Sequence, residues 1–85
     1  MAQSDLTRNL IEALEGWVPG LAGRVQIETP LFQSGELDSL ALFNLLTWIE
    51  EQIGSPVDTG SLDPAREWST VADILRYIER RRSAP

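Results

Sequence analysis

The fold is decided by residues 35–54, which read GELDSLALFNLLTWIEEQIG. Asp38 is a good N-terminal cap, because its carboxylate can accept hydrogen bonds from the unpaired N–H groups of a first helical turn. The apolar residues that follow recur at three- and four-residue spacing, which predicts an amphipathic helix from Ser39 to Gln52. Gly54 and Pro56 are expected to close it.

A helical wheel gives this helix two different faces. The predicted core face consists of Leu42, Leu45, Leu46, Ile49 and Ile53. The rest of the helix keeps apolar residues among its polar ones, which is unusual for a face that only meets solvent. We expect this second face to contact partner proteins through Leu40, Phe43, Asn44, Thr47, Trp48 and Glu51.

The chain before this helix predicts one further helix and a long connection. An apolar stripe predicts a first helix from about Asp5 to Glu15, capped by Ser4 and stopped by Gly16 and Pro19. The connection from Trp17 to Leu37 is long enough that it is expected to be functional or held by its own side chains. Its apolar residues are expected to pack onto the helices: Leu21, Val25, Ile27, Leu31 and Phe32.

Two more helices are predicted after the central one. Asp63 followed by Pro64 is typical of a helix start and indicates a short third helix. The last helix should begin near Ser69 or Thr70, since Thr70 and Asp73 have capping-box spacing. Two tryptophans are expected to anchor the loop and helix ends: Trp17 and Trp68. The prediction is an all-α four-helix bundle, with three long helices, one short helix and a long first loop.

Composition narrows the classes of function. The 85 residues make one small domain, residues 1–85, with little interior for a deep catalytic pocket. The chain has no cysteine and no histidine, which removes thiolate and imidazole metal ligands and the commonest general base. We therefore expect no metal site, no catalytic residue and no enzyme activity. A small carboxylate enzyme that uses Glu36 with Asp38 is the least supported alternative, because nothing places a pocket beside them.

The net charge of −6 is concentrated in one part of the chain. Residues 25–65 contain seven acids and no basic residue. Nucleic acid is an unfavourable partner for such a surface, whereas a basic protein surface is a suitable one. The alternative is that the acidic surface only keeps the protein in solution. The N-terminus lacks a signal-peptide pattern and no apolar run is long enough to span a bilayer, so we expect a cytoplasmic monomer.

Ser39 lies where a covalent phosphate would be stabilised. A serine in the first turn of a helix points outward, beside unpaired N–H groups and the positive end of the helix dipole. Asp38 and Glu36 offer hard oxygen ligands that suit the Mg²⁺ ion of a modifying enzyme. Asp-Ser at a helix start also has an ordinary structural explanation, since both residues favour this position.

Three motifs occur at matching distances along the chain. Gly35 precedes Asp38-Ser39-Leu40 in a Gly-x-x-Asp-Ser-Leu pattern, and the helix ends in Glu-Glu-x-x-Gly at residues 50–54. The last helix begins with Thr-Val-x-x-Ile at residues 70–74. With these motifs the chain resembles the phosphopantetheine-binding carrier protein family over nearly its full length.

The resemblance implies a carrier function. A phosphopantetheinyl transferase would move 4'-phosphopantetheine from coenzyme A to the hydroxyl of Ser39, with Asp38 and Leu40 beside the attachment site. The terminal thiol of the arm would then hold an acyl group as a thioester, which provides thiol chemistry to a chain without cysteine. Further implied partners are an adenylating acyl or aminoacyl ligase and a downstream acyltransferase or condensing enzyme.

The motifs also bear on the cargo. Members that serve fatty acid synthesis usually carry acids just after the serine, where this chain has Ala41 and Asn44. Residues 34–39 and the Arg66, Trp68 and Thr70 positions look like those of stand-alone D-alanyl and aminoacyl carriers. We expect a free-standing carrier of aminoacyl cargo, loaded by a separate ligase. The alternatives are an acyl carrier for fatty acid or polyketide chains, and an unmodified helical protein-interaction module.

Overall fold

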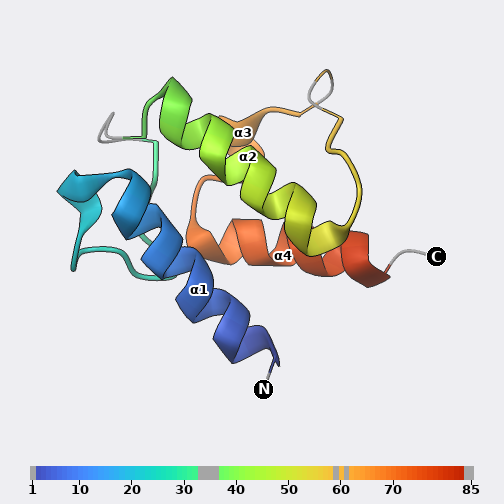
Figure 1. Ribbon diagram of the computed structural model, residues 1–85, viewed down its shortest axis with the longest axis horizontal. Coiled ribbons are helices and arrows are strands. Elements are labelled where there is room, and N and C mark those ends of the chain that lie inside the picture. Colours follow the sequence, from blue (N-terminus) through green and yellow to red (C-terminus); the bar gives the residue numbers. More distant parts are fainter. Residues whose placement is uncertain (1, 33–36, 59, 61, 84–85) are drawn as a thin grey trace.

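The computed structural model describes residues 2–32, 37–58, 60 and 62–83 (Figure 1). Within these ranges it contains helices and no strand, which confirms the predicted bundle of three long helices and one short one. The elements are α1 (Ala2–Trp17), a 3₁₀ turn (Pro19–Leu21), α2 (Ser39–Ile53), α3 (Pro64–Glu67) and α4 (Val71–Ser83). The 3₁₀ turn follows from Pro19, whose fixed φ suits the start of a helical turn.

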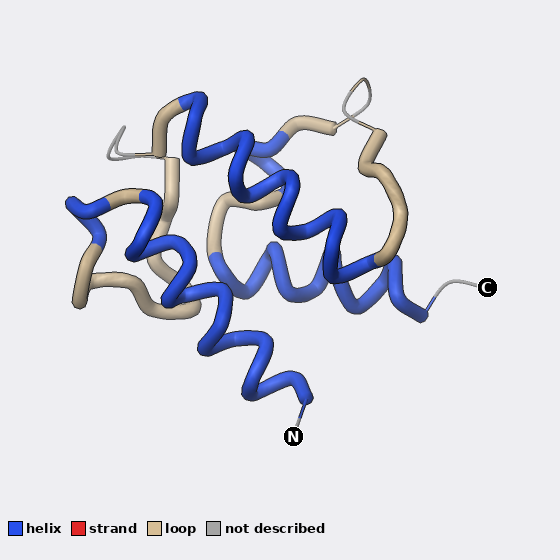
Figure 2. Tube along the Cα trace, viewed as in Figure 1, coloured by secondary structure: helices blue, strands red, loops and turns tan. Residues whose placement is uncertain are grey.

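Helix α4 lies at the centre of the packing. It contacts both α1 and α2, which also contact each other, and the short α3 packs against α4 (Figure 1). The tube in Figure 2 shows the long first connection passing from the end of α1 to the start of α2. A single cluster of buried apolar side chains joins α1, α2, α4 and the first connection, and Trp68 adds to it directly after α3.

Helix α2 is rotated relative to the predicted wheel. Its most buried residues are Ala41, Leu45 and Ile49, at i, i+4 and i+8. Leu42 and Leu46, which were predicted to form the core face, lie half-buried on one side of this stripe and pack against it. The small side chain of Ala41 allows the first turn of α2 to lie close to the core. The predicted wheel was drawn from the large apolar residues and therefore left Ala41 out.

Helix α1 is longer than predicted at both ends. It begins at Ala2, so Ser4 lies inside the helix and is not its N-cap. It continues through Gly16 to Trp17, just before Pro19. Burial of one helix face outweighs the low helix propensity of a single glycine. The buried residues of this face are Leu6, Leu10 and Leu14.

The predicted starts of α2 and α3 are confirmed, and α2 ends at Ile53, one residue later than predicted. Asp38 is the N-cap of α2, and Gly54 ends the helix in the left-handed region, with φ of 73°. At α3, Pro64 occupies the first turn and Asp63 is the N-cap residue, although its side chain makes no capping hydrogen bond. The backbone carbonyl of Asp63 instead accepts from the N–H groups of Arg66 and Glu67, at 3.0 and 2.9 Å.

The first connection is held by buried side chains and by two backbone hydrogen bonds to the chain around the start of α4. Leu21, Val25 and Leu31 are buried as predicted, and Phe32 is half-buried. Ile27 was predicted to pack inward, but its side chain is 49% exposed. Its carbonyl accepts from the N–H of Ala72 at 2.9 Å, so the backbone of Ile27 docks on the first turn of α4 while the side chain faces outward.

Asp73 organises the start of α4. Its N–H donates to the hydroxyl of Thr70 at 3.1 Å, and its carboxylate accepts from the hydroxyl of Ser69 at 2.5 Å. The same carboxylate pairs with Arg76. The hydrogen bond from Ser69 is the largest cause of a pKa of Asp73 below its ordinary value of 3.8, with burial opposing it and Thr70 and Arg76 adding to it. The carbonyl of Ser69 also accepts from the N–H of Leu31 at 2.8 Å.

Asp73→Asn should destabilise the fold by about 1 kcal/mol at pH 7, the usual worth of a capping interaction. Since folding lowers the pKa of Asp73, its carboxylate stabilises the protein above the unfolded-state pKa. That contribution is lost as the pH falls through the folded-state pKa, so the stabilities of the two proteins should converge below it. Urea unfolding across this pH range measures the difference. Asp5→Asn, which removes an exposed carboxylate paired with Arg8, is the control and should change little. A pH-independent difference for Asp73→Asn would contradict the assignment.

Candidate functional site

Ser39 is the first residue of α2 and is exposed. Its neighbours Asp38 and Leu40 are exposed as well, and Leu40 keeps 69% of its surface. The structure thus presents the whole Asp-Ser-Leu tripeptide on the surface of the protein. The hydroxyl of Ser39 is therefore open to contact by another protein.

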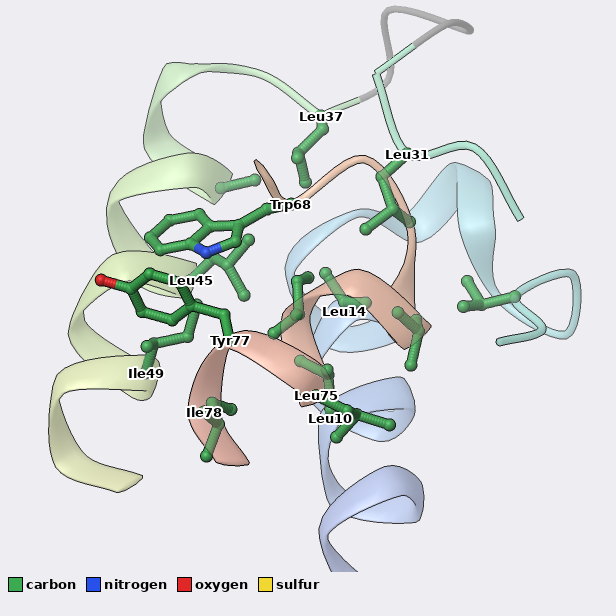
Figure 3. Close-up of a cluster of buried hydrophobic side chains, with 14 of the residues drawn as sticks. Leu10, Leu14, Leu31, Leu37, Leu45, Ile49, Trp68, Leu75, Tyr77 and Ile78 are labelled. Carbon is green, nitrogen blue, oxygen red and sulfur yellow. The ribbon is translucent and has the colours of Figure 1, made fainter. Parts of the chain in front are cut away.

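Two buried residues hold this turn in place. Leu37 precedes it and is 8% exposed, and Ala41 follows it and is 2% exposed. Figure 3 shows the side chain of Leu37 pointing into the core beside Trp68. The chain is therefore fixed on both sides of Asp38, Ser39 and Leu40, and their exposure follows from the anchoring of their neighbours.

Asp38 fixes the start of the helix. Its carboxylate Oδ1 accepts from the N–H of Ala41 at 2.8 Å, and its carbonyl accepts from the N–H of Leu42 at 2.9 Å. This arrangement orients the first turn and its dipole toward Ser39. The predicted second acid, Glu36, lies outside the described residues. Within the described ranges no cluster of three or more acidic side chains is arranged to hold a metal ion.

The residues at this site fit a covalently attached 4'-phosphopantetheine. An exposed hydroxyl at a helix start gives a phosphodiester free access and a favourable electric field. The chain has no histidine or cysteine, and the one carboxylate described beside Ser39 is bonded to the helix start.

The predicted partner residues of α2 separate into two groups. Leu40, Phe43, Thr47 and Glu51 are exposed together on one face, with Phe43 at 62%. Asn44 and Trp48 are half-buried on the flank of the helix, and Trp48 packs against the core cluster. Asn44 lies closer to the core than the wheel predicts, because the core stripe is centred on Leu45. Partner contact through Asn44 and Trp48 stays a prediction. We call Leu40, Phe43, Thr47 and Glu51 the outer face of α2.

Glu50 has a role that the sequence did not reveal. Its carboxylate accepts from the N–H of Val57 at 2.9 Å and so fixes the connection after α2. In the sequence Glu50 and Glu51 look alike, as a pair of acids in one motif. The structure gives them different neighbours, and Glu51 is the acid that remains exposed. After the left-handed turn at Gly54 the chain folds back toward the last turn of α2, which brings the N–H of Val57 to Glu50.

No helix in the described part of the chain is long and apolar enough to cross a membrane. This finding agrees with the lack of a long apolar run in the sequence.

Comparison with known proteins gives one match. A family model described as "Phosphopantetheine attachment site" matches residues 8–78, a range that includes Ser39 and reaches from α1 into α4. No curated protein and no solved structure matches the chain. The family is one of non-catalytic carriers, whose partners are phosphopantetheinyl transferases and acyl-handling enzymes. Since the match spans most of the 85 residues, the chain belongs to the phosphopantetheine attachment site family and is a carrier protein with a covalent 4'-phosphopantetheine arm.

Proposed function

We propose that Ser39 carries the arm and that the protein presents an acyl group, most specifically an aminoacyl group, to its partner enzymes. The observation that supports this is the exposed hydroxyl of Ser39, held at the start of α2 between buried Leu37 and Ala41. When attached, the arm supplies a thiol on which the cargo is carried as a thioester.

Each residue of the turn has a part in the attachment. The oxygen of Ser39 forms a new bond to the phosphorus of coenzyme A that bears the pantetheine. The bond from that phosphorus to the bridging oxygen of the diphosphate breaks, adenosine 3',5'-bisphosphate leaves, and the hydroxyl proton passes to the transferase. Asp38 keeps the helix start in register through Ala41. Leu40, fully outside the core, is available to contact the transferase beside the reacting hydroxyl.

The proposed attachment is tested by intact mass spectrometry. The purified protein is incubated with coenzyme A and a promiscuous phosphopantetheinyl transferase, and should gain the mass of one arm. A chain that stays unmodified would favour the alternative of a helical interaction module. Peptide mapping of the modified protein should place the added mass on the peptide that contains Ser39.

For the cargo, we infer an amino acid or a similarly small carboxylate, loaded in the cytoplasm by a separate adenylating ligase on a monomeric carrier. Support comes from the positions of Arg66, Trp68 and Thr70, which look like those of aminoacyl carriers. It also comes from the bundle interior, where Leu45 and Ile49 are fully buried and bulky. A small cargo needs no space between the helices, whereas a long alkyl chain would have to displace such residues to be sheltered.

The cargo is identified on the holo-protein from its native host. Purification at mildly acidic pH preserves the thioester, and intact mass spectrometry then reports the adduct on the arm. An aminoacyl adduct that hydroxylamine releases would support the proposal. A fatty acyl or polyketide adduct would contradict it and favour the alternative acyl carrier.

Phe43→Ala should slow modification by the transferase without weakening the fold. Phe43 is 62% exposed on the outer face of α2, so its loss removes partner contact and little packing. We expect kcat/KM to fall about tenfold or more, as for an interface residue worth about 1–3 kcal/mol. The urea midpoint should stay near that of the wild type.

Two variants control for this prediction. Ile27→Ala removes an exposed apolar side chain outside α2 and should leave kcat/KM unchanged. Trp48→Ala should lower stability as well as modification, because Trp48 packs against the core. Equal losses of kcat/KM in Ile27→Ala and Phe43→Ala would show that general surface apolarity, and not the outer face of α2, is recognised.

A further inference from the structure

A polar hollow of about 390 Å³ lies between α3 and α4. None of the residues that line it belongs to α2, so it is a different surface from the outer face described above. Six charged residues line it: Arg66 and Glu67 from α3, and Asp73, Arg76, Glu79 and Arg80 from α4. We call this site the α3–α4 hollow.

The three carboxylates of the hollow already have partners. Asp73 accepts from the hydroxyl of Ser69 and pairs with Arg76. Glu67 accepts from the N–H of Asp63 at 3.4 Å. Glu79 takes part in an interaction of its own. Asp73 and Arg76 therefore largely offset each other, whereas Glu67 and Glu79 keep their negative charge beside the hollow.

Two of the three arginines of the hollow are not paired with a carboxylate among the described residues. Within the described part of the chain, neither Arg66 nor Arg80 forms an ion pair or a side-chain hydrogen bond, and both are exposed. They come from different helices and meet at the same hollow. Each guanidinium carries a planar set of donors that matches a carboxylate in a two-point contact. The hollow thus offers two positive groups, from two helices, whose donors are not used within the described part of the chain.

We propose that the α3–α4 hollow binds an acidic segment of a partner protein, with one carboxylate on Arg66 and another on Arg80. The identity of that partner as an enzyme acting on the arm rests on the proposed function. A protein segment fits better than a compact polyphosphate, because the wall also carries three carboxylates that would repel a dense anion. Carboxylates spaced along a peptide can reach the two arginines separately.

The charge distribution of the chain supports this choice of partner. Residues 25–65, which include α2, carry seven acids and no basic residue, so they repel an acidic segment. All six residues that line the hollow follow residue 65 and so lie outside that acidic stretch. An acidic segment is therefore directed to α3 and α4, which leaves the outer face of α2 to other contacts.

The binding is tested on the full chain with a synthetic peptide of alternating Glu and Ala, at low ionic strength, by NMR titration. Amide shifts should concentrate at residues 66–67 and 73–80, and should weaken as salt is added. Arg66→Glu with Arg80→Glu should raise the Kd about tenfold or more. Arg8→Glu with Arg82→Glu makes the same change in net charge away from the hollow and is the matched control, with little expected effect.

Three results would overturn the proposal. The first is an absence of peptide-induced shifts in the hollow, and the second is an equal loss of binding in the control pair. The third is inorganic phosphate producing the same shifts at equal or lower concentration, which would indicate a small-anion site. Modification by coenzyme A and the transferase is measured in parallel. A chain that takes no arm but binds the peptide at Arg66 and Arg80 would contradict the carrier function and leave the hollow assigned.

Discussion

Ser39→Ala is expected to fold like the wild type and to gain no mass when it is incubated with coenzyme A and a phosphopantetheinyl transferase. The hydroxyl is exposed and the helix start is capped by Asp38, so its removal should cost no more than about 0.5 kcal/mol. The effect on modification should nevertheless be complete, because the hydroxyl oxygen is the atom to which the arm is bonded.

Ser55→Ala is the matched control for this loss. Ser55 is also an exposed serine, but it follows Gly54 after the end of α2 and lacks a helix start beside it. It should be modified as fast as the wild type. Intact mass and circular dichroism on the same samples separate a missing attachment site from a missing fold. An arm on Ser39→Ala would refute the assignment of this residue, whatever the fate of Ser55→Ala.

The predictability of α2 from sequence depends on the range of the interactions involved. Its start was predicted correctly and its end to within one residue, because a cap such as Asp38 bonds to a residue three positions away and Gly54 adopts a left-handed turn by itself. The rotation of the helix about its axis was not predicted correctly, because it depends on which side chains the other helices can accommodate. Ala41 contributes almost nothing to an apolar pattern, yet it is 2% exposed.

The loop and the α3–α4 hollow show the same limit. The pattern of the first connection marks Ile27 as apolar, and its side chain remains exposed because its carbonyl docks on Ala72, far along the chain. Nothing in the sequence around Arg66 and Arg80 distinguishes this pair from the other arginines. They meet only because α3 packs against α4, which is a tertiary contact.

Trp68→Ala should cause the largest loss of stability of any single change considered, about 3–5 kcal/mol. Trp68 is fully buried, and its ring lies edge-to-face with Tyr77 at a centroid distance of 5.5 Å (Figure 3). Its truncation would leave a cavity where α2, α4 and the chain after α3 meet. A domain of 85 residues has a total stability of about 4–13 kcal/mol, so this variant should lose a large share of it, and all of it if the wild type lies at the lower end of that range.

Trp68→Phe separates the packing of this residue from its polar atom. The indole N–H is buried and has no acceptor among the described residues, and an unmade hydrogen bond of this kind costs about 1–3 kcal/mol. Phenylalanine removes that donor and keeps an aromatic edge against Tyr77, so it should destabilise by less than about 2 kcal/mol. Urea unfolding measures the stability of both variants, and Trp17→Ala, which truncates a half-buried tryptophan, serves as the reference. Trp68→Ala should lose the most stability. Trp68→Phe should lose no more than Trp17→Ala. A Trp68→Ala chain as stable as Trp17→Ala would mean that the core does not depend on this contact, because the neighbouring side chains can collapse into the space.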